Sequence, residues 1–494
     1  MKKINYFILS LIVLLSLGSC DNVDFGDIND NTNGATEGNP SSLLANAIMN
    51  YGTITGRIYL TQPTLYVQYQ TQVTYTTEMR YSDSPMTWSS YYLGSLSNLN
   101  EVINYNLDPD NQGSTLNAQG APENQIGVAK IMMAVIAKRL TDNYGPIPYS
   151  QAFQGVDNLT PAYDKQEDVY KNLISQVKEA RDMMDAGSKG PTGDILFNGN
   201  ISKWQSFANS LILQMSLQLS NKYPSASGYA ATEFNAALSD AHGVIEDVAN
   251  EPWFQFQDLE GFRNPWLANR RPDYYLSQEF TDALKGNEDL NPTSNSTYDS
   301  RLKVYGKSGT ADGVPYGYSD GSGAGKNQMS ATNYWNGTSP LPVMTASYTY
   351  LNRAEAAELK WTSEDATEML RMGIEASYET LDFHHGTAIA EDATAYADAR
   401  VADAGTIGML QVIREEKWVS LFGQAFDAWS EWRRTDVPSL VPATDYLNSG
   451  EIPTRLRYPS EESSLNNANY TEAVSWLIPA EDTNTSLIWW DQTN

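Results

Sequence analysis

Histidine and cysteine, which often serve as acid–base catalysts and nucleophiles, are rare in this chain of 494 residues. Its three histidines are His242, His384 and His385, and a Ser-His-Asp triad would have to use one of them. The G-x-S-x-G turn that presents the serine of many hydrolases does not occur in the sequence. Adjacent residues on a strand or loop point apart, so we interpret His384 and His385 as surface residues rather than as a metal site.

Paired carboxylates are the other arrangement that could be catalytic, because two of them can hydrolyse a glycosidic bond. Asp427 and Glu431 are one helical turn apart, with two tryptophans nearby and two arginines directly after them. Carboxylates at this spacing on one helix usually face solvent or a cation, so we interpret the segment as a structural ion-pair network. The sequence therefore predicts no catalytic residue, no metal site and no cofactor. The loops 273–299 and 312–326 contain enough oxygen ligands for a structural calcium ion but no calcium-binding motif, so we predict none.

The lone cysteine, Cys20, ends a segment that predicts a covalent modification. Two lysines are followed by an apolar run from Ile8 to Leu17 and then by small residues directly before the cysteine. The pattern resembles the bacterial lipoprotein signal, in which Cys20 would receive lipid and become the first mature residue. We expect residues 1–19 to be a signal peptide, residues 20–40 a lipidated flexible tether rich in Asn, Asp and Gly, and residues 41–494 a single body.

Composition limits the partners of this body. The formal net charge is −28, whereas nucleic-acid binding needs clustered Lys and Arg, so we expect no nucleic-acid partner. The chain has 30 Tyr, 12 Trp and 13 Phe. Aromatic rings among polar residues suit the apolar faces and hydroxyl groups of sugars, but they also pack protein cores. Composition alone does not separate the two.

Aromatic residues in polar or irregular stretches are the candidates for ligand binding, together with one arginine. A ring would stack on the ligand while polar groups fix its orientation. Packing against helices is the alternative for each ring. The candidates are Arg80, Tyr81, Trp88, Tyr91, Trp266, Tyr334 and Trp335. In contrast, Trp204, Trp418, Trp429 and Trp432 lie on periodic apolar faces and are predicted to be core residues.

Helical periodicity in the apolar residues predicts the elements that must position these candidates. Ser202 and Gln205 fit a capping box at the start of one of these helices. The segment 251–342 is rich in Gly, Pro and Asn, and we expect it to be a loop-rich insertion with a short periodic piece at 274–285. Helices are expected near 42–54, 88–105, 128–140, 169–187, 204–219, 232–247, 345–360, 364–381 and 407–434.

Six segments, in this order and spacing, resemble the SusD/RagB family of nutrient-binding outer-membrane lipoproteins, in its SusD-like second branch. They extend from about residue 125 to residue 466. They are TDNYGPIPYSQAF (141–153), KWQSFANSLILQMSLQLS (203–220), YDSRLKVY (298–305), SYTYLNRAEAAELKW (347–361), EEKWVSLFGQAFDAWSEWRRTDVP (415–438) and RLRYPSEESSLN (455–466). The departures are mild: Asn143 and Pro146 vary within the first turn, and Gln214 and Gln218 stand where basic residues are expected.

The resemblance implies a mostly α-helical fold, with tetratricopeptide-like helix pairs as scaffold and a large loop-rich region facing the ligand. It implies a lipoprotein anchored at the outer membrane, facing outward, which acts as a lid over a SusC-like TonB-dependent transporter barrel. An oligosaccharide or a peptide would be the ligand, captured for uptake without catalysis. The alternatives are a surface glycoside hydrolase and a stand-alone adhesion lipoprotein. Because ligand residues vary within the family, the resemblance assigns none of them here.

Overall fold

Helices make up about half of the residues that the structure describes. The computed structural model describes residues 38–54, 61–286 and 289–492, so Cys20, the predicted signal peptide (1–19) and most of the predicted tether (20–40) lie outside the described residues. The helices are α2 (Pro40–Ile54), α3 (Gln62–Tyr66), α4 (Ser97–Leu107), α5 (Ser114–Asn117), α6 (Pro122–Tyr144), α7 (Gln166–Met183), α8 (Ile201–Gln218), α9 (Tyr229–Leu238), α10 (Gln278–Lys285), α11 (Leu302–Tyr305), α12 (Ala346–Glu358), α13 (Ala366–His385), α14 (Ala393–Ile407), α15 (Met409–Ser420), α16 (Ala425–Thr435), α17 (Glu462–Leu465) and α18 (Asn467–Val474). A π-helical segment, Ser90–Leu96, leads into α4.

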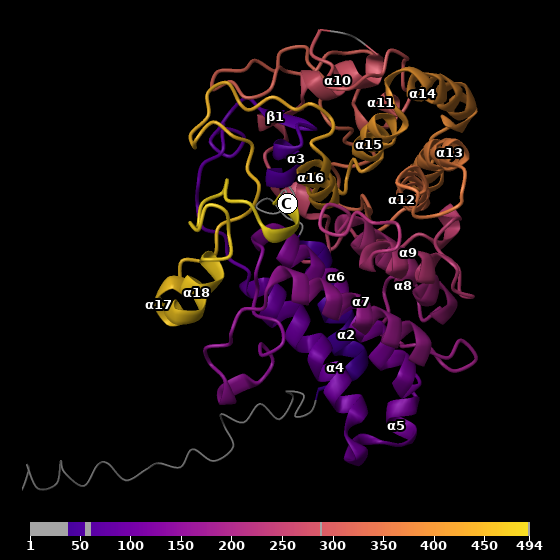
Figure 1. Ribbon diagram of the computed structural model, residues 1–494, viewed down its shortest axis with the longest axis vertical. Coiled ribbons are helices and arrows are strands. Elements are labelled where there is room, and N and C mark those ends of the chain that lie inside the picture. The colour runs from indigo at the N-terminus through magenta and orange to yellow at the C-terminus, as the bar shows by residue number, and fades with distance from the viewer. Residues whose placement is uncertain (1–37, 55–60, 287–288, 493–494) are drawn as a thin grey trace, which may run out of the picture. The chain divides into compact units, whose positions relative to one another are not determined.

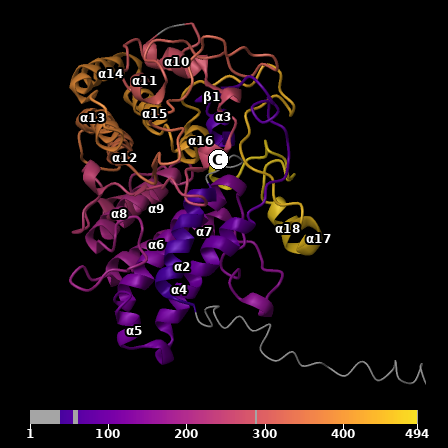
Figure 2. The ribbon, with the colours of Figure 1, turned by 180° about the vertical axis from the view of Figure 1, so that it is seen from behind.

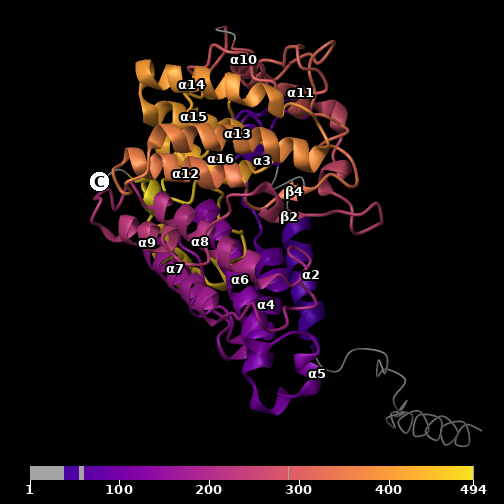
Figure 3. The same cartoon turned by 90° about the vertical axis from the view of Figure 1, so that its right-hand side faces the viewer.

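Consecutive helices pack as pairs in two groups. Within the first group α6 packs on α7, α7 on α8 and α8 on α9, and within the second α12 packs on α13, α13 on α14 and α14 on α15. Figure 3 shows the second group lying side by side above the first. On α7, Val169, Leu173 and Val177 recur every four residues and are buried, because one stripe of an amphipathic helix faces its neighbours. The predicted mostly α-helical fold with tetratricopeptide-like pairs is confirmed.

Two small antiparallel sheets join segments that are distant in sequence. Strand β1 (Gln70–Gln72) pairs with β3 (Tyr274–Leu276), and β2 (Trp253–Phe254) pairs with β4 (Leu341–Pro342). Between α9 and α12 the chain otherwise forms loops, short turns and the helices α10 and α11, which lie near the top of Figure 1 close to α14 and α15. Seen from behind, the same loops cover this end of the body (Figure 2). The β1–β3 pair therefore brings the segment after residue 68 against the loop-rich segment.

The start of α8 differs from the predicted capping box. Asn200 caps the helix, and its side-chain oxygen accepts a hydrogen bond from the backbone N–H of Lys203 at 3.1 Å. Ser202 lies inside the first turn and is exposed. The prediction placed the cap two residues too late, because both Asn and Ser are good capping residues and the sequence offers both.

Other helices also differ from the periodic pattern. The segment 407–434 forms two helices, α15 and α16, because the chain turns at Gly423, whose φ of +94° suits glycine. Helix α9 ends at Leu238 rather than near residue 247. Helix α14 was not predicted, since its face toward the protein is made mainly of alanines with little apolar contrast.

Three of the four tryptophans predicted as core residues have at most 2% of their surface exposed: Trp204, Trp418 and Trp429. Trp432 is half-buried and packs against the same core. Within the described ranges, no helix combines the length and the apolar character needed to cross a bilayer.

Candidate ligand-binding site

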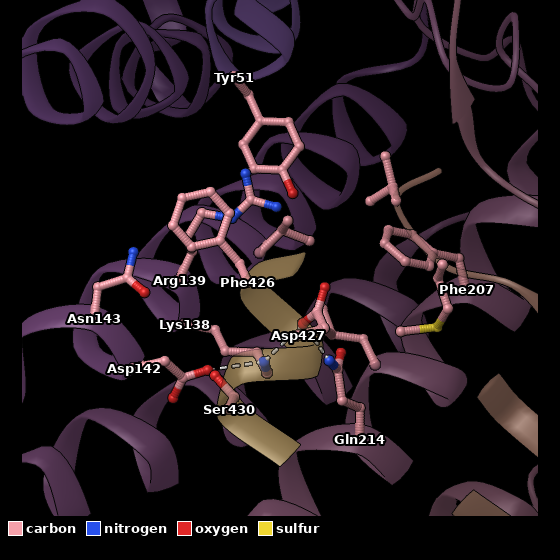
Figure 4. A pocket seen from close by; sticks show the side chains of 14 residues that line it. Tyr51, Lys138, Arg139, Asp142, Asn143, Phe207, Gln214, Phe426, Asp427 and Ser430 are labelled. Atoms are coloured by element: carbon pink, nitrogen blue, oxygen red, sulfur yellow. Dashed lines mark hydrogen bonds and ion pairs between the residues drawn. The ribbon is translucent and has the colours of Figure 1, made fainter. Parts of the chain in front are cut away.

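Cavity size separates packing gaps from places where a sugar residue would fit. Figure 4 shows a small cavity between α6, α8 and α16, in which Lys138 lies between Asp142 and Asp427 at 2.9 and 3.4 Å. Its volume of about 20 Å³ has room for about one water molecule. Small-molecule sites usually have volumes of about 300–1,000 Å³. Two other cavities reach this range, with about 340 Å³ beside Glu279 and about 450 Å³ beside Tyr75.

The carboxylates considered for glycoside hydrolysis are both engaged by polar side chains of the helical scaffold. Glu431 lies 2.5 Å from a guanidinium nitrogen of Arg434 and 3.4 Å from Lys417 Nζ. Asp427 accepts a hydrogen bond from Gln214 Nε2 at 2.7 Å, in addition to its ion pair with Lys138. Burial opposes ionisation of Glu431, but Arg434 and Lys417 outweigh it and lower the pKa. The two side chains thus belong to ion-pair networks inside the helical scaffold.

The cavity of about 450 Å³ lies where β1 and β3 end together. Gln72 is paired with Tyr274 in the sheet, and the chain leaves β1 through a turn that carries Thr74 and Tyr75 on the surface. On the other side of the cavity, Arg270 lies just before a short helical turn that leads into β3. Residues about 200 positions apart in sequence, such as Gln72 and Tyr274, therefore line the same cavity.

Tyr75 is the exposed aromatic residue of this cavity. The residue is 62% exposed, and its backbone has a φ of +55°, which is uncommon for a bulky residue. Gln68 and Tyr81 share this conformation, so three of the six non-glycine residues at positive φ in the described chain fall in one stretch of 14 positions. Such strained residues concentrate at functional sites.

Arg270 supplies the cationic group of the cavity. Its guanidinium lies 5.4 Å from the centre of the Tyr75 ring, and Nη1 donates a hydrogen bond to the Tyr75 hydroxyl at 3.4 Å. The side chain is 65% exposed and also lies 3.5 Å from the carboxylate of Asp273. An exposed ring beside guanidinium donors, a carboxylate and the hydroxyls of Thr74 and Thr77 can stack on one face of a sugar and hydrogen-bond its hydroxyl groups.

Hydrogen bonds and packed rings hold this surface in place. Glu78 Oε2 accepts hydrogen bonds from Gln72 Nε2 at 2.7 Å and from the Tyr274 hydroxyl at 3.3 Å. The Tyr274 ring packs on Trp335 with ring centres 5.7 Å apart, and Trp335 packs on Trp266 at 5.0 Å. Trp266 and Trp335, two of the predicted ligand residues, therefore meet behind the cavity wall, with 3% and 5% of their surface exposed.

The other predicted ligand residues also pack inside the protein. Tyr334 packs on Phe422, Trp88 packs on Tyr144, and Tyr91 has no exposed surface. Tyr81 is likewise buried; its hydroxyl accepts a hydrogen bond from the backbone of residue 443. Arg80, which is half-buried, donates from Nε to the backbone carbonyl of residue 445 at 2.5 Å. Direct contact of these residues with a ligand stays a prediction. In this conformation the aromatic rings pack against the protein, and Arg80 is hydrogen-bonded to the backbone.

The interpretation of His384 and His385 as surface residues is wrong. They end helix α13, where His384 stacks on Trp253 with ring centres 3.9 Å apart and lies 3.2 Å from Glu251. Burial lowers the pKa of His385 to about 4, and the neighbouring His384 adds to the effect. Of the three histidines, His242 is the one on the surface, with a side chain 39% exposed.

Sequence reasoning missed Tyr75 and Arg270. The available signal was the run QTQVTYTT (70–77), in which a tyrosine stands among polar residues, with Val73 as the one apolar neighbour in the run. Such a ring has few reasons to be buried. Nothing in the sequence pointed to its contact with Arg270, because that contact depends on the pairing of β1 with β3.

Comparison with known proteins agrees with this architecture. The SusD-like_2 family, described as "Starch-binding associating with outer membrane", matches residues 32–459. The chain belongs to this family. No protein with a curated description matches the sequence.

Solved structures show the same fold. A chitin-binding protein is 26% identical and superimposes with a TM-score of 0.76, over 92% of this chain and 100% of that one. A Bacteroidetes SusD-like protein, AC2a, has 24% identity and a TM-score of 0.73 over the same shares. A chitin-binding SusD homologue from Flavobacterium johnsoniae has 20% identity and a TM-score of 0.71, over 92% of this chain and 99% of that one.

Proposed function

We propose that this protein is a non-catalytic, glycan-binding lipoprotein of the outer membrane, which holds an oligosaccharide at the cavity between Tyr75 and Arg270. The observation that carries the proposal is the exposed Tyr75 ring, held at positive φ beside a guanidinium in a polar cavity of about 450 Å³. The cavity offers a stacking face and several hydrogen-bonding groups, which is the combination that sugars require.

Family membership supports the wider part of the proposal. The family is described as associated with the outer membrane, and we propose that Cys20 carries the lipid that anchors the body there. We further propose that the protein serves as the substrate-capturing lid of a SusC-like TonB-dependent transporter. Because two of the similar structures are named as chitin-binding, oligomers of N-acetylglucosamine are the first ligands to test. Malto-oligosaccharides are the second, following the family description.

Replacement of Tyr75 tests the site. We expect Tyr75→Ala to weaken binding of the preferred oligosaccharide by about 1–2 kcal/mol, which is about a five- to thirtyfold increase in Kd, because the stacking face is lost. Isothermal titration calorimetry on the full chain measures this change. The ring is mostly exposed, so the variant should keep its melting temperature.

Tyr298→Ala is the matched control. Tyr298 is also an exposed tyrosine, at 41%, and also has a cation over its ring, with Lys303 Nζ 6.0 Å from the ring centre. It lies outside the lining of the cavity, so its loss should leave Kd unchanged. Equal Kd values for wild type and Tyr75→Ala would rule out the proposed site.

A further inference from the structure

The second cavity of sugar size, with a volume of about 340 Å³, is lined by both apolar and acidic side chains. Tyr316, Tyr318 and Val441 belong to its walls, while Glu279 and Asp289 contribute carboxylates. Neither Lys nor Arg occurs among the described residues that line it. Tyr318 and Val441 are 43% and 70% exposed, so the cavity is reached from solvent.

Glu279 of α10 provides a carboxylate at this cavity, with one oxygen unpaired as far as the structure describes the chain. Its Oε1 accepts a hydrogen bond from the backbone N–H of Tyr316 at 3.2 Å. Its Oε2 is buried and has no hydrogen-bond partner among the described residues. Burial raises the pKa of Glu279 to about 7, and Asp282, one turn further along α10, raises it as well. A buried carboxylate oxygen without a donor is costly, so a donor from outside would bind here favourably.

The protein itself supplies no cation for Glu279 in the described part of the chain. Lys285, on the same helix, is paired with Asp312, and Arg80 donates from Nε to a backbone carbonyl. The other titratable groups that influence Glu279 or are influenced by it are Asp282 and the phenols of Tyr81 and Tyr316. None of them carries a positive charge.

We propose that this cavity binds the primary ammonium group of an amino sugar, with Glu279 Oε2 as the acceptor and Tyr318 and Val441 packing against the sugar ring. An ammonium group has three N–H donors on one small centre, and its positive charge compensates an unpaired carboxylate. The choice of a sugar as the carrier of the amine rests on the proposed glycan-binding function. Gln68, which is strained at a φ of +59°, joins this wall, and the segment that follows it reaches the Tyr75 cavity.

The test compares two tetrasaccharides of equal length, one of glucosamine and one of N-acetylglucosamine, on the full chain by calorimetry. Glu279→Gln keeps the side-chain shape and an acceptor for Tyr316 N–H but removes the charge. We expect it to weaken binding of the glucosamine tetramer about tenfold or more, because hydrogen bonds to charged groups are about twice as strong as neutral ones. Binding of the N-acetylglucosamine tetramer should stay unchanged.

Glu260→Gln is the control for general attraction of cations to a chain of net charge −28. Glu260 is exposed and outside the cavity lining, so its loss should have no effect. The melting temperature of Glu279→Gln at pH 8 should equal or exceed that of the wild type, because an unpaired buried charge is gone. If this variant fails to fold, Tyr318→Ala replaces it and should weaken the glucosamine tetramer selectively.

Three outcomes would overturn the inference. The first is that the glucosamine tetramer binds wild type and Glu279→Gln with equal affinity. The second is that Glu260→Gln loses as much affinity for this tetramer as Glu279→Gln does. The third is that tri-lysine binds in a Glu279-dependent way while the glucosamine tetramer does not bind. The proposed glycan function fails separately, if neutral oligosaccharides do not bind or bind independently of Tyr75. The two results are therefore distinguishable.

Discussion

Glu355 of α12 is a carboxylate whose side chain has no exposed surface, and it is surrounded by cations. Arg434, Lys417 and Arg414 approach it at 2.8, 2.5 and 3.0 Å. Burial opposes ionisation, but Arg434, Lys417 and Arg414 together hold the pKa of Glu355 well below its ordinary value. A buried ion pair of this kind adds little over a well-packed apolar core, yet removing one partner leaves the others uncompensated.

We therefore expect Glu355→Gln to lower the free energy of unfolding by about 3–5 kcal/mol, measured by urea denaturation at pH 7. Glu179→Gln is the control: its carboxylate lies 3.3 Å from Lys130 but is 63% exposed, so the change should stay below about 1 kcal/mol. Similar losses for both variants would contradict the assignment of Glu355 to a buried cluster.

The pH dependence of this loss has a definite sign. Because the folded pKa of Glu355 is lowered, its stabilising contribution is complete above the ordinary carboxyl pKa of about 4.5 and disappears as the pH falls through the folded value. The difference between wild type and Glu355→Gln should thus narrow below about pH 4.5. Glu279 acts in the opposite direction: its raised pKa means that stability falls as the pH rises toward 7.

At the scale of elements, the turn at Gly423 brings together the charged side chains of α15 and α16 around Glu355. Lys417 and Glu431 are 14 positions apart, which would be about 21 Å along one continuous helix. The break between α15 and α16 folds the chain back, so that Lys417 Nζ lies 3.4 Å from Glu431. The periodic pattern of 407–434 contains both helices but says nothing about the angle between them.

The N-terminus of α8 offers a test at the same scale. Replacing Asn200 by Ala should reduce the free energy of unfolding by about 1 kcal/mol, because the backbone N–H of Lys203 loses its acceptor. Ser202→Ala should change it by less than about 0.5 kcal/mol, since Ser202 is an exposed residue inside the first turn. Urea denaturation of the two variants measures both, and a larger loss for Ser202→Ala would restore the predicted capping box.

For the whole molecule, the proposed lipid on Cys20 would anchor the body at the membrane. Cys20→Ala should move the protein from the membrane fraction to the soluble fraction and leave the body folded. The tagged wild-type protein, extracted in a mild detergent, should bring down a large β-barrel protein in stoichiometric amount.

Retention of Cys20→Ala in the membrane fraction would refute the lipid anchor. A wild-type protein that purifies without a barrel would favour a stand-alone binding or adhesion protein. Folding of the variant is checked by its circular dichroism spectrum, which should match that of the wild type.

Much of the fold could be predicted from the sequence, because it depends on local patterns. Helical stripes such as Val169, Leu173 and Val177 specify a helix and its buried face without reference to the rest of the chain. Trp204 and Trp418 were predicted as core residues on the same ground, and their burial confirms it. The order and spacing of six segments identified the family.

The candidate site was decided by the tertiary structure. Tyr75 and Tyr81 lie six positions apart, and both follow polar runs, yet one is 62% exposed and the other is buried. The difference arises from distant segments: the backbone of residue 443 donates a hydrogen bond to the Tyr81 hydroxyl, whereas Tyr75 meets Arg270 at the surface. A ring is available to a ligand only where the rest of the fold leaves it exposed. The local sequence around a ring does not determine which distant segments pack over it.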